Sequence, residues 1–449
     1  MKFGGTSVAD AHAFENVARI VASQRSVAPV VVVSAMGGVT DALLAATVAA
    51  GEGRADEAIA SLEETFTRHH NTAAELLTPT AAEAFSKQVD NAAHQINELL
   101  RSSADNPLRR RPTQDAVLAY GEMLSSELLA EVLNARGTNA QHVDARRCIL
   151  TDDQYTVALP LMPDTLVKAR DVLIPVIESG RAPVLGGFIA STAEGTTTTL
   201  GRGGSDYTAA LIGAALTTDE IQIWTDVTGV LTADPRVVPE AQTVERLSYA
   251  EASELAYFGA KVLHPKTIQP AIEGAIPVRI CNSRAPDEIG TLVGPRTETT
   301  DRTIKAIAHK SGVTTVQITS ARMLGAYGFL RALFEVFERH KTVVDVVATS
   351  EVSVSLSLDD ASALPVIVTE LEQLGKVGVE KGCAIVCVVG EGLRGTPGIA
   401  ARVFSAISDI NVTLISQGAS SINFTFAIEE ERVQEAVRRL HQEFFGRHG

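Results

Sequence analysis

The stretch Val30-Val-Val-Val-Ser-Ala-Met-Gly-Gly-Val-Thr40 joins a short apolar run to a glycine loop that leads into a helical pattern. Consecutive β-branched residues favour a buried strand. Similar short runs at 183–189, 221–225 and 278–281 alternate with longer segments of Ala, Leu and Glu. This alternation predicts an α/β fold with a mostly parallel central sheet and helices on both faces. In such sheets, ligands bind beyond the carboxyl ends of the strands, where Ser34 to Thr40 lie.

Residues 52–135 have a different composition. Glu, Ala, Leu and His dominate there, and no β-branched run occurs. The segment is predicted to be a helical excursion from the α/β pattern, ending in an amphipathic helix over 113–133. His69 and His70 have no Cys or carboxylate at metal-ligand spacing, so a pair of surface histidines is predicted.

Composition limits the possible classes of protein. The 449 residues carry a formal charge of −15, which argues against a protein that wraps nucleic acid or lies on anionic lipid. The longest apolar run, 27–39, is shorter than the ~18 residues of a membrane span, and the start resembles no secretory signal, so the cytoplasm is expected. The scattered Cys148, Cys281, Cys383 and Cys387 are predicted to be thiols rather than a disulfide framework.

The C-terminal part contains an internal repeat. Gly328-Phe-Leu-Arg-Ala-Leu-Phe334 matches Gly398-Ile-Ala-Ala-Arg-Val-Phe404, and the offset of 70 residues also pairs the alternating runs 352–358 and 422–428. Each copy has the pattern of a small βαββαβ module. The preceding segment 285–303 is polar and rich in Pro and Gly, which is typical of a linker.

Two further glycine loops precede predicted helices. Lys2-Phe-Gly-Gly-Thr-Ser7 provides a cation and close backbone approach, and Thr196-Thr-Thr-Thr-Leu-Gly-Arg-Gly-Gly-Ser-Asp206 adds hydroxyls, a guanidinium and a carboxylate. Amide groups at a helix N-terminus suit a phosphate or carboxylate ligand. The chain contains neither a P-loop nor a dinucleotide fingerprint. Ser205 or Asp206 alone could cap the helix, but Arg202 with Gly203 and Gly204 exceeds what a cap requires.

These motifs, with Trp224-Thr-Asp-Val and Phe258-Gly-Ala-Lys-Val-Leu-His-Pro265 in the same order, resemble aspartate kinases (aspartokinases) of the monofunctional, lysine-sensitive type. The resemblance implies an amino-acid-kinase-like three-layer α/β/α domain followed by two ferredoxin-like ACT domains. The expected bounds are 1–295 for the kinase domain, 313–382 for an inserted first ACT domain, and 304–312 with 383–449 for the second. In this arrangement the strand 304–309 pairs with the second module. Relatives carry an apolar strand before Lys2, so a few β-branched residues ahead of Met1 are expected.

The implied activity is ATP-dependent phosphorylation of the side-chain carboxylate of L-aspartate to 4-phospho-L-aspartate, the first step of lysine, threonine and methionine biosynthesis. In the resemblance, Glu122 binds the α-ammonium of aspartate, Arg202 binds its α-carboxylate, and Asp206 orients Lys2. The implied catalytic residues are Lys2, Gly4, Gly5 and Asp206. The implied substrate-binding residues are Ser34, Thr40, Glu122, Arg202, Gly203, Gly204 and Ser205.

For the nucleotide, the family pattern falls on Lys2, Gly5, Thr225, Asp226, Leu231, Arg236 and Lys261. Leu231 stands where lysine-sensitive relatives carry Tyr. Mg2+ is expected to bridge the phosphates of ATP without a dedicated protein cage.

Feedback inhibition by free lysine is implied by a further set of residues, with Asp345 as the partner of an ammonium group. The set is Met323, Ala326, Phe329, Leu330, Val344, Asp345, Thr349 and Ser350. A homodimer or homotetramer through the ACT domains is expected, with no nucleic-acid or membrane partner. Two alternatives stay open: another amino-acid kinase of the same fold, such as an acetylglutamate or glutamate kinase, and a non-catalytic amino-acid sensor.

Overall fold

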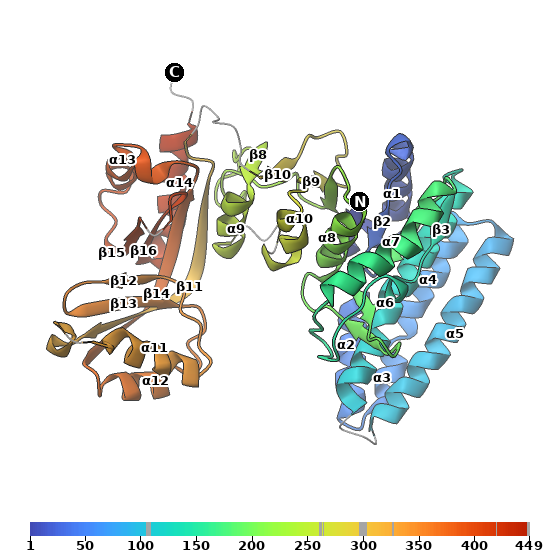
Figure 1. Ribbon diagram of the computed structural model, residues 1–449, viewed down its shortest axis with the longest axis horizontal. Coiled ribbons are helices and arrows are strands. Elements are labelled where there is room, and N and C mark those ends of the chain that lie inside the picture. The colour runs from blue at the N-terminus through green and yellow to red at the C-terminus, as the bar shows by residue number, and fades with distance from the viewer. Residues whose placement is uncertain are drawn as a thin grey trace. The chain divides into compact units, whose positions relative to one another are not determined.

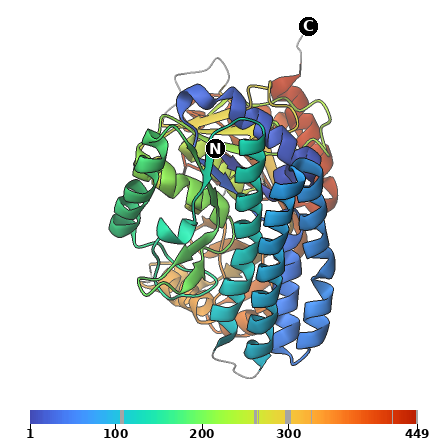
Figure 2. The ribbon, with the colours of Figure 1, turned by 90° about the vertical axis from the view of Figure 1, so that its right-hand side faces the viewer.

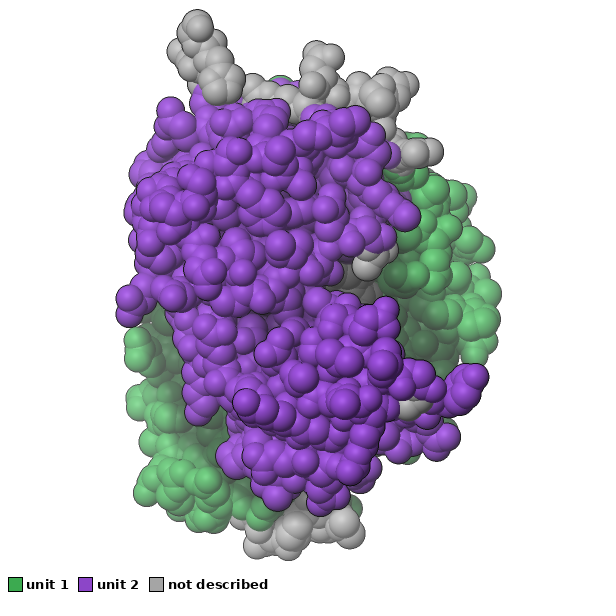
Figure 3. All heavy atoms as spheres, turned by 90° about the vertical axis from the view of Figure 1, so that its left-hand side faces the viewer, with its two compact units in different colours: residues 1–230, 263–295 green, residues 231–262, 296–449 purple. Residues whose placement is uncertain are grey.

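The computed structural model describes residues 1–104, 109–259, 263, 265–295, 303–325, 327–418 and 420–446. The chain divides into two compact units, coloured separately in Figure 3. Unit 1 comprises 1–230 and 263–295, and unit 2 comprises 231–262 and 296–449. The units therefore divide differently from the predicted domains, because 231–262 group with the C-terminal part. The predicted domain bounds themselves stay a prediction.

Unit 1 is built around a parallel sheet. Its strands are β1 (Lys2–Phe3), β2 (Val31–Val33), β3 (Ala140–His142), β4 (Ala182–Gly186), β7 (Ile221–Thr225), β9 (Val278–Asn282) and β10 (Thr291–Gly294). They are ordered β3-β4-β2-β1-β7-β9-β10, and only β10 runs antiparallel to its neighbour in this set. A separate hairpin is formed by β5 (Ile189–Ser191) and β6 (Thr197–Thr199).

The helices of unit 1 cover this sheet (Figure 1). They are α1 (Ala11–Ser23), α2 (Val39–Gly51), α3 (Ala55–Ser61), α4 (Glu63–Leu76), α5 (Pro79–Ala104), α6 (Arg110–Ala135), α7 (Met162–Glu178), α8 (Gly204–Leu216) and α10 (Gln269–Glu273). The three residues of β2 are all buried, since a strand covered on both faces has no solvent side. The predicted α/β fold is confirmed.

The predicted helical excursion is also confirmed, but its last helix is not amphipathic as predicted: α6 has buried residues on all its faces, because it packs against α2, α5 and the strands β4 and β6. Figure 2 shows the long helices α4, α5 and α6 side by side. The prediction for the two histidines is wrong for His69, whose side chain is fully buried and whose Nδ1 lies 2.7 Å from the carbonyl of Thr65. Burial lowers the pKa of His69 to about 4. His70 is half-buried and contacts Ser86 and Asp90. Helix packing, rather than a metal, accounts for this pair.

Unit 2 is built around an antiparallel sheet of order β12-β13-β11-β14-β16-β15. These strands are β11 (Ala306–Thr319), β12 (Val347–Thr349), β13 (Ser353–Leu358), β14 (Lys376–Val389), β15 (Val412–Gln417) and β16 (Asn423–Glu429). The other elements are β8 (Arg246–Ser248), α9 (Tyr249–Tyr257), α11 (Phe329–Arg339), α12 (Leu364–Leu371), α13 (Ile399–Ala406) and α14 (Val433–Phe445). Two hydrophobic clusters, one for each repeat, fill the space between helices and sheet.

The sequence repeat is a structural repeat. Gly328 and Gly398 cap α11 and α13 with φ of 80° and 83°, a conformation that favours glycine. The first part of β11 pairs with Val389 to Ile385 of β14, and its last part pairs with Glu380 to Lys376. The predicted pairing of 304–309 with the second module is thus confirmed. The first module has the order β12-β13-β11-β14, which is 2-3-1-4 as in ferredoxin-like folds, and the second has the matching order β15-β16-β14-β11, with the start of β11 in the fourth place.

Two sequence-based expectations about the whole chain can be compared with the described residues. No helix among them is long and apolar enough to cross a bilayer. The thiols of Cys148, Cys281, Cys383 and Cys387 are buried and free, as predicted.

Candidate active site

A cavity of about 570 Å³ in unit 1 lies at the carboxyl ends of β1 and β2. It is lined by the loops after β1 and β2, by one face of α6, and by the loop that leads into α8. Ten of the predicted catalytic and substrate-binding residues line it: Lys2, Gly5, Ser34, Thr40, Glu122, Arg202, Gly203, Gly204, Ser205 and Asp206. The three glycine loops, far apart in the sequence, therefore meet at one site.

Gly4 is the predicted residue that does not line the cavity. Its N–H donates to the carbonyl of Trp224 at 3.2 Å, so this amide is not free to bind an anion. The prediction that the Gly4 amide binds phosphate is not supported. Gly5 keeps the role of close approach, because a Cβ added there would lie 3.0 Å from the carbonyl of Ala35.

Lys2 carries the central positive charge of the cavity. Its strand β1 lies between β2 and β7, and its ammonium lies 2.8 Å from a carboxylate oxygen of Asp206 in the first turn of α8. The Lys2 and Asp206 side chains are only 12% and 17% exposed. Low solvent exposure strengthens this ion pair and holds the ammonium at one position, as predicted.

Hydroxyl groups connect the loop 34–40 with the loop 196–206. Ser34 Oγ donates to Ser205 Oγ at 3.0 Å, and Ser125 Oγ of α6 donates to the carbonyl of Ser34 at 2.7 Å. Gly187 lets α8 approach this closely, since a Cβ there would lie 2.7 Å from Ser205. The first turn of α8, capped by Gly203, thus lies in the cavity wall, and the positive end of the helix dipole favours an anion there, although the Gly204 amide already donates to the carbonyl of Gly201.

Glu122 is a buried carboxylate in the cavity wall. It is 3% exposed, and its Oε2 has no hydrogen-bond partner in the part of the chain that the structure describes. Burial raises the pKa of Glu122 to about 8, although the backbone amides of Ala35 and Glu122 oppose the rise. A carboxylate that lines a cavity and has one unpartnered oxygen is suited to a cationic ligand group.

Arg202 is exposed and stands between Gly201 and Gly203, whose φ values are 74° and 73°. Among the described residues it has no ion-pair partner. A planar guanidinium without a protein carboxylate is suited to a carboxylate ligand. The cavity therefore combines a guanidinium without an ion-pair partner among the described residues, a carboxylate with one unpartnered oxygen, and an ammonium held by Asp206.

Two positioning residues were missed by sequence reasoning. Arg68 of α4 donates to the carbonyls of Ala9 and Gly37 at 3.1 and 3.0 Å, and so ties the first two loops together. Asp115 of α6 is buried beneath the third loop. In the sequence, each is a single charged residue within a helical pattern, and no local signal distinguishes it from a surface charge.

The predicted nucleotide residues are distributed over both units. Thr225 is the last residue of β7 in unit 1 and Asp226 follows it; the Thr225 hydroxyl donates to Asp226 Oδ1 at 3.2 Å, and neither residue lines the cavity. Leu231 and Arg236 belong to unit 2. The Arg236 side chain is 88% exposed and forms an ion pair of 2.6 Å with Asp234. Lys261 lies outside the described residues, so a common nucleotide site stays a prediction.

Comparisons with known proteins agree with this geometry. A model of the amino acid kinase family matches residues 1–282, and an ACT domain model matches residues 386–444. The chain is 38% identical to aspartokinase 1 of Arabidopsis thaliana chloroplasts, over 99% of its own length and 80% of that protein. It is 36% identical to lysine-sensitive aspartokinase 3 of Escherichia coli, over 99% and 98%. The chain belongs to the aspartokinase family.

Solved aspartokinase structures have the same fold. The structure of E. coli aspartokinase III in complex with aspartate and ADP matches with a TM-score of 0.82 and covers 99% of both chains at 36% identity. The structure of that enzyme in complex with lysine and aspartate matches with a TM-score of 0.81, covering 99% of this chain and 98% of that one at 36% identity.

The predicted effector residues of this aspartokinase lie in unit 2, except Ala326, which is outside the described residues. Met323, Phe329 and Val344 pack against the core of the first module, and Leu330 is 41% exposed. The exposed Thr349 and Ser350 flank the end of β12. These residues belong to the start of α11 and to the segment around β12, and whether they bind one ligand stays a prediction.

Asp345 has a partner that the sequence did not indicate. The Tyr257 hydroxyl at the end of α9 donates to Asp345 Oδ1. Lys310 pairs with the neighbouring Asp359, and its ammonium lies 4.9 Å from the centre of the Tyr257 ring. Burial raises the pKa of Asp345. The carboxylate expected to bind an effector ammonium is thus held by a neutral donor.

Proposed function

We propose that this chain transfers the γ-phosphoryl group of ATP to the side-chain carboxylate of L-aspartate and forms 4-phospho-L-aspartate. The observation that carries the proposal is that Lys2, Arg202 and Glu122 open onto one cavity of unit 1. The similarity to aspartokinases over the whole chain supports aspartate as the acceptor.

The acceptor is already an anion, so the reaction needs no general base. It needs two negatively charged partners to be held in line, together with positive charge at the transferring group. Lys2 and the amides at the start of α8 supply that charge. Arg202 binds the α-carboxylate of aspartate in this proposal, and Glu122 accepts hydrogen bonds from its α-ammonium.

Mg2+ is part of the proposal as a companion of the nucleotide. No group of three or more Cys, His, Asp or Glu side chains suited to a metal lies together within the described ranges. The cavity is lined by the carboxylates of Asp41, Glu122 and Asp206, and this set fits an ion held mainly by phosphate oxygens. When bound, the ion neutralises charge on the phosphates.

A hydroxamate assay with ATP, Mg2+ and hydroxylamine tests the activity. Hydroxamate from aspartate and none from glutamate supports the proposal. Product from glutamate or acetylglutamate instead indicates another amino-acid kinase, and no product from any acceptor indicates a sensor.

The pH dependence of acceptor binding follows from Glu122. Its carboxyl, with a pKa of about 8, is mostly protonated at pH 7 in the free protein, and only the ionised form binds an ammonium well. We expect the aspartate KM to fall about tenfold between pH 7 and pH 9. The ATP KM over the same range is the control. An aspartate KM that is constant or rises with pH contradicts this role of Glu122.

We extend the proposal to feedback inhibition by lysine, because a similar E. coli enzyme has been solved in complex with lysine. Asp345 is the proposed partner of a lysine ammonium, which has to displace the Tyr257 hydroxyl. Substituting Asp345→Ala is expected to raise the lysine concentration for half-inhibition at least ~10-fold, since charge-assisted hydrogen bonds contribute about 1.5–3 kcal/mol. Tyr257→Phe is expected to lower it, because the competing donor is gone.

Dose–response curves for lysine measure both effects. Asp360→Ala is the matched control, because this neighbouring acidic residue is exposed and bonds only within its own turn. Unchanged inhibition in Asp345→Ala, or weaker inhibition in Tyr257→Phe, would remove Asp345 from the effector site.

We also propose assembly as a homodimer or homotetramer through the ACT modules, in the cytoplasm. Within the described residues the outer strands β12 and β15 of the unit 2 sheet each pair with a single strand, so each has one edge without a ladder partner, although the two strands also approach each other. Light scattering coupled to gel filtration gives the subunit number, and a monomer at micromolar concentration contradicts this part of the proposal.

A further inference from the structure

Asp115 is a fully buried carboxylate that no step of the proposed reaction uses. It is 0% exposed and lies on α6, seven residues before Glu122 and so on the same face of the helix. Its two oxygens accept hydrogen bonds from the Thr156 amide at 2.9 and 3.1 Å, from the Thr199 amide at 3.0 Å and from the Thr199 hydroxyl at 2.7 Å. Three donors satisfy a charge that would otherwise be unfavourable in this interior.

Both partners of Asp115 belong to the cavity wall. Thr156 and Thr199 line the cavity, and Thr199 precedes Arg202 by three residues. Thr156 has a φ of 76°, which is unusual for a β-branched residue, and its carbonyl lies 3.2 Å from where a Cβ on Gly201 would stand. The loop that carries Arg202 therefore rests on two groups that Asp115 holds.

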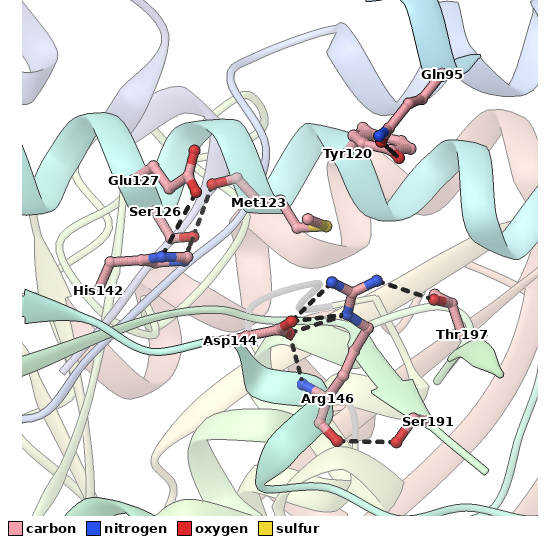
Figure 4. A network of polar contacts seen from close by, with 10 residues as sticks. All are labelled: Gln95, Tyr120, Met123, Ser126, Glu127, His142, Asp144, Arg146, Ser191 and Thr197. Atoms are coloured by element: carbon pink, nitrogen blue, oxygen red, sulfur yellow. Dashed lines mark hydrogen bonds and ion pairs between the residues drawn. The ribbon is translucent and has the colours of Figure 1, made fainter. Parts of the chain in front are cut away.

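Thr199 is the last residue of the β5–β6 hairpin, and the opposite end of this hairpin, at Ser191 and Thr197, is held by other residues (Figure 4). Arg146 donates to the Thr197 hydroxyl at 3.1 Å and forms a forked ion pair with Asp144. Ser191 donates to the carbonyl of Arg146 at 2.8 Å. Since the hairpin is held at this end, loss of the Asp115 contacts changes mainly the end that continues into Arg202.

We propose that Asp115 is a positioning residue that fixes Arg202 relative to Glu122, and so places the α-carbon of the acceptor at the distance from Lys2 that the side-chain carboxylate of aspartate can span. The inference rests on the proposed function, in which these two side chains bind the α-groups of the acceptor. Glu122 is fixed by its place on α6, whereas Arg202 lies on an exposed turn between two glycines. Asp115 connects the two, because it belongs to the helix and holds the strand that leads into the turn.

The chain offers a matched pair of variants. Thr199→Val removes the hydroxyl that donates to Asp115 and keeps the amide. Thr198→Val removes the neighbouring hydroxyl on the opposite face, which is equally buried and lies 2.7 Å from the Thr151 hydroxyl. Both substitutions keep the side-chain shape and remove one buried hydrogen bond, so a general loss of stability is common to both.

In Thr199→Val we expect the aspartate KM to rise about tenfold, with the ATP KM and kcat unchanged within about twofold, and the preference for aspartate over glutamate to fall. In Thr198→Val the aspartate KM is expected to stay at the wild-type value. Asp115→Asn is expected to raise the aspartate KM more than Thr199→Val does, since the NH2 group of asparagine cannot accept a hydrogen bond and faces one of the donors.

Steady-state kinetics with both acceptors and thermal melting of the three variants decide the question. If Thr198→Val and Thr199→Val change the aspartate KM equally, or if Thr199→Val changes the ATP KM as much as the aspartate KM, the inference is overturned. An Asp115→Asn chain that does not fold leaves the threonine pair as the test. Wild-type protein that forms no product from aspartate overturns the proposed function and this inference together, whereas active wild type with unaffected Thr199→Val overturns only the inference.

Discussion

Substituting Lys2→Met is expected to lower kcat about 10³-fold while the protein stays folded. The ammonium is the full positive charge fixed in the cavity by Asp206, and removal of one preorganised donor to a developing charge typically lowers turnover by 10²–10³. Methionine retains the length and apolar stem of the side chain, so the packing between β2 and β7 is kept.

Turnover at saturating ATP and aspartate measures this effect. The control is Lys87→Met on α5, which removes a lysine whose side chain is 73% exposed and which pairs only with the exposed Glu83. A Lys2→Met protein that retains more than about a tenth of wild-type kcat would show that charge at this position does not stabilise the transition state.

The second large effect is expected from Glu122→Gln. Without the carboxylate the α-ammonium of aspartate loses a charge-assisted partner, and we expect the aspartate KM to rise about 100-fold. The same substitution is expected to stabilise the ligand-free protein at pH 8. The folded protein holds the proton of Glu122 more tightly than the unfolded chain does. The contribution of Glu122 to the free energy of unfolding therefore falls as the pH rises from about 4.5 towards 8.

Denaturant unfolding at pH 5 and pH 8 measures the stability change. The gain in the free energy of unfolding is expected to be on the order of a few kcal/mol at pH 8 and small at pH 5. Glu131→Gln, on an exposed position of the same helix, is the control. A glutamine variant that is no more stable at pH 8 would mean that Glu122 is ionised without cost in the free protein.

The sequence predicted the parts of the site that consist of consecutive residues. The local sequence is enough to predict an anion site where glycines precede a helix beside Lys2, Arg202 or Asp206. Short segments determine where backbone amides and helix ends point. The repeat of 70 residues likewise predicted two similar modules, since Gly328 and Gly398 occupy positions that require positive φ.

The sequence did not predict groups whose role depends on tertiary burial. His69 and Asp115 lie in helical segments with neighbouring polar residues, and only packing against other elements separates them from surface side chains. Glu122 lies in the same kind of segment, and its role was predicted only through the family resemblance. Tyr257 is a similar case, since its partner Asp345 is 88 residues away in the chain. The expectation of a catalytic role for Gly4 is not supported, because its N–H donates to the carbonyl of Trp224 in β7. The local sequence does not show this pairing, since Trp224 is distant in the chain.

The long strands β11 and β14 run through both modules of unit 2, and each carries a glycine with positive φ near its middle, Gly312 and Gly382. Each module contains one half of each long strand, so the two modules are joined through both strands. Swapping regulatory properties between related enzymes therefore calls for moving the tandem as one cassette. A graft that joins two proteins at position 382 would place its junction inside β14, between the residues that pack in the first hydrophobic cluster and those that pack in the second.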